Sequence, residues 1–119
     1  MLERLMLING EWVPASDGAV KQSVNPATGE VLGTAPLATH EDVERALDAA
    51  RIGQKEWAAC SQQERSVVLR RAADLFDDRL EEIAQSITAE MGKPIGMARG
   101  EAAEIPALLR LCASAADIM

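Results

Sequence analysis

The sequence predicts an α/β fold in which a β-hairpin region is followed by three mainly α-helical segments. Over the first 37 residues, turn residues separate short apolar and β-branched stretches, which is typical of hairpins. From residue 38 onward, apolar residues recur at steps of three and four, the spacing of one face of a helix. We therefore divide the chain into a strand region, 1–37, and a helical segment, 38–119.

Two turns organise the strand region. Asn9 and Gly10 stand between residues 5–8 and 11–13, and this pair is a strong hairpin signal. A second turn contains Pro26 and Gly29, so residues 20–24 and 31–35 are predicted to be strands on either side of it.

Two capping patterns start the first two helices. Thr39 with Asp42 resembles a capping box and predicts a helix over about residues 40–58. Ser61 with Glu64 is a closer match and predicts a second helix over residues 62–91. That helix would be about 45 Å long, so we expect something beyond this chain to cover part of it. Its polar face is predicted to be solvated and carries Arg71, Asp74, Asp78, Glu81, Glu82 and Gln85.

The last helix is predicted to begin near Pro94, after Gly92 has ended the second one. Pro106 would cost about 3 kcal/mol inside a helix, so we expect a kink or a restart there. Gly92, Gly96 and Gly100 either allow close approach of a neighbour or simply weaken the helix. The apolar face reaches the last residue without a stop signal, which predicts a truncated chain, and consists of Ala98, Ala102, Ile105, Leu109, Cys112, Ala116 and Met119.

Composition narrows the possible partners. The net charge is −7 and only three residues are aromatic, so nucleic acid and anionic membranes are unfavourable partners. No apolar stretch approaches the roughly 20 residues of a membrane span, and we expect a soluble, cytoplasmic protein.

Isolated reactive residue types are interpreted as structural. Cys60 and Cys112 have no neighbouring base or metal-ligand pattern and are expected to be packing thiols. The single histidine, His40, is assigned no role. Acidic side chains on one helix face are usually solvated rather than catalytic, and this applies to Asp77, Asp78, Glu81, Glu82, Glu101 and Glu104.

Five short motifs occur in series along the chain. They are Ile-Asn-Gly-Glu-Trp at 8–12, Asn-Pro-Ala-Thr-Gly-Glu at 25–30, Ala-Ala-Asp-Leu at 72–75, Glu-Met-Gly-Lys-Pro at 90–94 and Ala-Arg-Gly-Glu at 98–101. In order and spacing, this series resembles the N-terminal part of the aldehyde dehydrogenase superfamily. The resemblance implies the N-terminal part of a cofactor-binding domain.

The resemblance also implies a function for the full-length protein. It would be a homo-oligomer that oxidises an aldehyde to a carboxylic acid with NAD or NADP, and a semialdehyde-type substrate is a family-level expectation. The family's catalytic cysteine and glutamate, its oxyanion-holding asparagine and its glycine-rich cofactor turn fall beyond this chain. We therefore assign no catalytic or cofactor-binding residue here and expect the 119-residue chain alone to be inactive.

One site can be carried over by resemblance. Several family members hold a structural monovalent cation with a main-chain carbonyl and an acidic side chain that match Val24 and Glu90 here. The alternative is that Glu90 is an ordinary residue at a helix end. A second function also remains open, a freestanding helical interaction module without catalytic activity, which would bind a partner through the apolar stripe from Leu69 to Met91.

Overall fold

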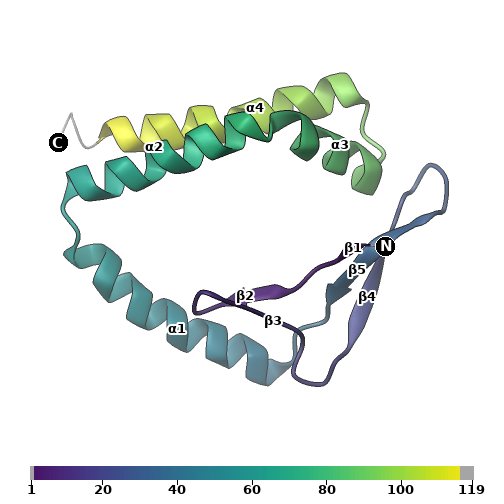
Figure 1. The fold of residues 1–119 in the computed structure, drawn as a ribbon, viewed down its shortest axis with the longest axis horizontal. Coiled ribbons are helices and arrows are strands. Elements are labelled where there is room, and N and C mark those ends of the chain that lie inside the picture. Colours follow the sequence, from purple (N-terminus) through teal and green to yellow (C-terminus); the bar gives the residue numbers. More distant parts are fainter. Residues whose placement is uncertain (1, 116–119) are drawn as a thin grey trace. The chain divides into compact units, whose positions relative to one another are not determined.

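The computed structural model describes residues 2–115, and their chain path is drawn in Figure 1. It divides into two compact units, one extending through Ala58 and one beginning at Ala59.

The first unit contains the predicted hairpin. Strands β2 (Met6–Ile8) and β3 (Glu11–Val13) pair antiparallel, with Leu7 opposite Trp12. Asn9 has φ 52° and Gly10 has φ 80°, so both turn residues take the left-handed conformation that a two-residue hairpin turn requires. The hairpin prediction is confirmed.

A three-stranded sheet forms the rest of the strand region. Strands β4 (Val20–Val24) and β5 (Val31–Pro36) pair antiparallel as predicted, and β1 (Leu2–Glu3) adds to β5 in parallel, giving the order β1-β5-β4. The turn is closed by the Gly29 N–H, which donates to the Asn25 carbonyl at 2.8 Å. Strand β1 is only two residues long, too short for a periodic signal, and the sequence did not indicate it.

Helix α1 (His40–Ala59) follows, one residue longer than predicted. Its capping box is present: the Asp42 N–H donates to Thr39 Oγ1 at 3.2 Å, and the Thr39 N–H donates to Asp42 Oδ2 at 3.0 Å. The apolar stripe of α1 is uncovered within its unit, with Val43 45% and Leu47 46% exposed.

The second unit corrects the prediction of one helix over residues 62–91. The structure has two helices, α2 (Gln62–Asp78) and α3 (Leu80–Met91), separated at Arg79. Arg79 has φ −114° and ψ 13°, and its guanidinium binds Glu82 in the first turn of α3 at 2.7 and 2.9 Å. The apolar steps continue across the break, so the pattern gave no sign of it. The break lets α2 and α3 pack separately on the last helix.

Helix α4 (Ile95–Ser114) returns alongside α2 in the opposite direction (Figure 1). Gly92 ends α3 with φ 72°, and Pro94 caps α4, as the sequence predicts. The predicted restart of the helix at Pro106 is wrong, because α4 continues through this residue, whose ring is buried. Burial of the Pro106 ring among packed helices offsets the loss of the main-chain hydrogen bond that a proline cannot donate.

Small residues form the core of this unit. Ala84 of α3 packs with Ala98 and Ala102 of α4, and all three are at most 1% exposed. Alanine side chains let two helices approach closely. Apolar side chains surround this contact, namely Leu80, Ile83, Ile87 and Ile95.

Ion pairs connect α2 and α3 to α4 across the polar face, whose side chains are exposed as predicted. Arg99 binds the Glu81 carboxylate through two 2.9 Å bonds, and Arg110 reaches Asp74 at 2.8 Å and Asp77 at 2.6 Å. The bonds from Arg99, followed by one from the Gln85 amide, lower the pKa of Glu81 to about 2.

Three smaller expectations can also be compared with the structure. A Cβ on Gly96 or Gly100 would meet no atom within 4 Å, so these glycines do not serve close packing between the described residues. Cys112 is exposed and Ala113 takes the buried position, so the packing role of Cys112 is wrong here. Ala116 and Met119 lie outside the described residues.

Over the described residues, no helix is both long enough and apolar enough to cross a membrane.

Candidate functional site

The connection between α3 and α4 carries the most characteristic sequence motif of the chain. The Gly92 N–H donates to the Thr88 carbonyl at 2.9 Å, which closes α3. Lys93 then forms an ion pair with Glu101, one turn and a half into α4. The motif therefore fixes where α4 begins relative to α3, and with it the position of the α4 side chains.

The predicted cation ligands lie in different units. Val24 is the last residue of β4, opposite Val31 at an irregularity in the register, and Glu90 is exposed in the last turn of α3. No three His, Cys, Asp or Glu residues gather as metal ligands in the part of the chain that the structure describes. The cation site therefore stays a prediction, with further ligands expected from outside this chain.

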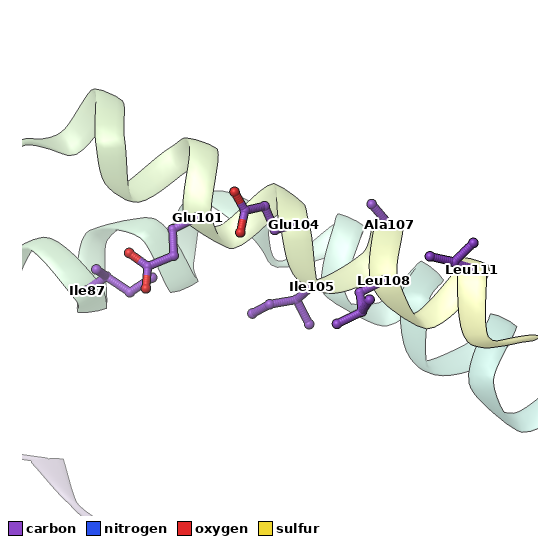
Figure 2. A pocket seen from close by; sticks show the side chains of 7 residues that line it. All are labelled: Ile87, Glu101, Glu104, Ile105, Ala107, Leu108 and Leu111. Atoms are coloured by element: carbon purple, nitrogen blue, oxygen red, sulfur yellow. The ribbon is translucent and has the colours of Figure 1, made fainter.

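A groove runs along the face of α4 next to α3. It is an open groove with a volume of about 590 Å³, and Figure 2 shows Ile105 and Leu108 of α4 and Ile87 of α3 among its lining side chains. Glu101 and Glu104 supply its only carboxylates, and every other lining residue is apolar. Glu104 makes no hydrogen bond or ion pair with the described residues, whereas Glu101 is held by Lys93.

Sequence reasoning treated Glu101 and Glu104 as structural and did not find this groove. The available signal was a second stripe on α4 at helical spacing, which includes Ile105, Leu108 and Leu111. Leu108 is 61% and Leu111 67% exposed, which separates this stripe from the buried alanines.

A buried carboxylate is the main polar feature of the first unit. Asp42 is 1% exposed, and its Oδ2 accepts bonds from the N–H and hydroxyl groups of both Thr39 and Ser16, at 3.0 to 3.3 Å. The Thr39 N–H, followed by the Ser16 N–H, lowers the pKa of Asp42. All of these partners stabilise an ionised carboxylate, which supports a structural role that fastens the loop around Ser16 to the start of α1.

The remaining reactive side chains form no catalytic group among the described residues. Cys60 is partly buried, and Cys112 is exposed. His40 has a side chain that is 90% exposed and lies 4.0 Å from Glu44. None of the three lines the groove.

The family is decided by comparison with a family model. The model of the aldehyde dehydrogenase family matches residues 12–119, which is most of the chain. The chain belongs to the aldehyde dehydrogenase family. The match to the family model confirms the resemblance that the five motifs indicate. Members of this family oxidise aldehydes with NAD(P).

Solved structures of aldehyde dehydrogenases agree with this fold. An NAD-dependent aldehyde dehydrogenase from Sinorhizobium meliloti is 37% identical, with a TM-score of 0.94 over 99% of this chain and 24% of that one. An NADP-dependent glyceraldehyde-3-phosphate dehydrogenase from Bacillus halodurans C-125 is 33% identical, with a TM-score of 0.93 over 96% and 24%. A NAD-dependent benzaldehyde dehydrogenase from Corynebacterium glutamicum is 32% identical, with a TM-score of 0.87 over 93% and 24%.

The chain spans about a quarter of the length of these aldehyde dehydrogenases. The matched quarter corresponds to the N-terminal region of the fold, as the motifs predict.

Proposed function

We propose that this chain is the N-terminal segment of an NAD(P)-dependent aldehyde dehydrogenase that oxidises an aldehyde to a carboxylic acid. The observation that carries the proposal is the TM-score of 0.94 over 99% of the chain, at 37% identity, to an enzyme of that kind. The catalytic cysteine and glutamate would come from polypeptide beyond these 119 residues, and the chain alone would be inactive.

In the overall reaction, aldehyde, water and oxidised cofactor give carboxylic acid, reduced cofactor and a proton. NAD or NADP, when bound, accepts the hydride. The residues of this chain would contribute structure rather than chemistry: the α2, α3 and α4 assembly would form part of the cofactor-binding domain. From the same family membership we propose a homo-oligomer in the cytoplasm.

A structural monovalent cation remains part of this proposal, with the Val24 carbonyl and the Glu90 carboxylate as two of its ligands. The Glu90 carboxylate is exposed and makes no hydrogen bond or ion pair with the described residues, so it is free to bind a cation. Oxygen donors suit hard cations.

The test is made on the protein translated from the complete reading frame that contains these residues. We expect it to reduce NAD⁺ or NADP⁺ when an aldehyde is added, monitored by the absorbance of the reduced cofactor. The 119-residue chain, assayed in parallel, should give no aldehyde-dependent signal.

Two results would overturn the proposal. One is aldehyde oxidation by the 119-residue chain alone at an enzyme-like rate. The other is a complete reading frame with no further polypeptide to supply a nucleophile and a cofactor turn, which would favour the interaction module.

A further inference from the structure

The turn between β2 and β3 places an asparagine directly before a glycine. Asn9 has φ 52° and is the only non-glycine residue with a positive φ among the described residues. Asn9 and Gly10 are both exposed, so water reaches the asparagine side chain and the peptide bond that follows it. The turn is therefore open to a reaction between this side chain and its own main chain.

The main-chain nitrogen of Gly10 is available as a nucleophile. Among the described residues, its N–H donates no hydrogen bond. Glycine has no side chain to obstruct the approach to its nitrogen, and even a Cβ built on Gly10 would meet no other atom within 4 Å. Neither a hydrogen bond nor a neighbouring group therefore protects this nitrogen.

We propose that Asn9 is a self-modification site, selected because the Gly10 nitrogen is free, and that it is converted into aspartate and isoaspartate. The Gly10 nitrogen loses its proton to solvent and attacks the side-chain carbonyl carbon of Asn9. A C–N bond forms, the bond to the side-chain amide nitrogen breaks, and ammonia leaves with a proton from solvent.

Water then opens the five-membered succinimide ring at one of its two carbonyl groups. Attack at the side-chain carbonyl gives aspartate, and attack at the main-chain carbonyl gives isoaspartate, in which the main chain runs through an additional methylene. In sum, asparagine and water give either acid and ammonia.

The hairpin can hold the succinimide without separating its strands. With positive φ at Asn9 and Gly10, the turn is of type I′. The ring fixes the rotation about the bond between Cα and the carbonyl carbon of Asn9, and turning over the Asn9–Gly10 peptide plane converts type I′ into type II′. Both types close two-residue hairpins, both have a positive φ at the first central residue, and glycine permits either sign of φ at the second.

A similar dipeptide in the same unit is protected. Asp17 precedes Gly18, which also has a positive φ of 74°. However, the Gly18 N–H donates to the Ala15 carbonyl at 2.9 Å, and the Asp17 carboxylate accepts the Ala19 N–H at 2.8 Å. Both reacting groups are therefore held in hydrogen bonds.

The test follows the protein from the complete reading frame during incubation at neutral pH. Mass spectrometry of its peptides measures the change from amide to acid, and labelled methyl transfer by an isoaspartyl methyltransferase measures isoaspartate. We expect both signals at Asn9. Asn25, the only other asparagine of this chain, should not react, because Pro26 has no N–H to lose.

Two variants examine the cause. Asn9→Gly keeps a residue that suits a type I′ turn and should remove the isoaspartate signal from this peptide. Asp17→Asn creates a second asparagine-glycine pair, in which the glycine N–H is hydrogen-bonded. The asparagine introduced at position 17 should react at least about fivefold more slowly than Asn9 in the folded protein. In urea, where both turns are unfolded, the two rates should become similar.

Two results would overturn the proposal. One is a rate at Asn9 no higher than that at Asn25. The other is equal reaction of positions 9 and 17 in the folded protein, which would mean that the free Gly10 nitrogen does not select the site. Aldehyde oxidation takes no part in this test, so either result leaves the proposed function intact.

Discussion

Among the described residues of the first unit, the largest fully buried side chain is the Asp42 carboxylate, whereas in the second unit the buried contact between helices consists of alanines. Asp42 accepts hydrogen bonds from Ser16, which lies 26 residues earlier in the sequence. Ala84, Ala98 and Ala102 are instead in close van der Waals packing. The buried contact in the first unit therefore depends on a charge state and on bond directions, and the buried contact in the second unit depends on side-chain volume.

Both units leave large apolar side chains uncovered. Examples are Leu47 of α1 at 46% and Leu111 of α4 at 67% exposed. In this respect the two units are alike. Uncovered faces of this kind are expected of a segment that packs against further polypeptide, as the proposed enzyme requires.

The largest effect is expected at the alanine contact. Ala102→Leu should destabilise the protein by about 3 kcal/mol, because added methylenes cannot fit where α3 and α4 approach closely. Urea unfolding followed by circular dichroism measures the change. Ala103→Leu places the same side chain at the next, exposed position and should alter stability by less than about 0.5 kcal/mol. Equal effects of the two substitutions would show that volume is not what limits this contact.

The Asp42 network should give a smaller, pH-dependent effect. Asp42→Asn weakens a set of hydrogen bonds made to an ionised carboxylate and should lower the unfolding temperature at neutral pH. The folded pKa of Asp42 lies below its ordinary value of 3.8, so its contribution is present above that pH and is lost as the pH falls through the folded pKa.

The gap between wild type and Asp42→Asn should therefore narrow on acidification below pH 3.8. Asp48→Asn is the control, since Asp48 lies on the same helix with a side chain that is 69% exposed. A gap that is constant with pH would mean that the charge of Asp42 does not matter.

The next largest change in stability is expected at the N-cap of α2. Ser61→Ala removes the hydroxyl that accepts the Glu64 N–H at 3.2 Å and should cost about 1 kcal/mol in the free energy of unfolding. Ser61→Asp, which retains an N-cap acceptor, should restore most of it. If alanine and aspartate at this position gave the same stability, the capping box would have no energetic role.

The smallest effect in simple buffer is expected at Glu90. Because this side chain is exposed, Glu90→Gln should change stability by less than about 0.5 kcal/mol when no K⁺ or Na⁺ is present. If Glu90 is a cation ligand, added K⁺ or Na⁺ should raise the unfolding temperature of the complete wild-type protein and not that of Glu90→Gln. A cation effect that is identical in both proteins would remove Glu90 from the ligand set.

Local signals predicted much of this fold. The Asn9-Gly10 hairpin, the Ser61 cap and the Gly92 helix end each depend on residues within a few positions of one another, so the sequence alone identifies them. The break at Arg79 was missed because the apolar steps continue through it, and tertiary packing on α4 decides it.

The site was less accessible to sequence reasoning. The partners of Asp42 include Ser16, far away in the chain, and the groove depends on α3 and α4 coming together. Glu104 is exposed, as predicted, and only the packing of α3 on α4 shows that it also lies beside the apolar residues of the groove.

If this chain is the N-terminal segment of an aldehyde dehydrogenase, it should function in place of the matching quarter of a related enzyme. The direct measurement is a chimera in which this chain replaces the matched segment of the Sinorhizobium meliloti enzyme, which is 37% identical to it. We predict a soluble protein that reduces NAD⁺ with aldehyde within about tenfold of the parent rate. A chimera that folds with the parent's unfolding temperature and yet shows no aldehyde-dependent NAD⁺ reduction would contradict the proposal that this chain is the N-terminal segment of an aldehyde dehydrogenase.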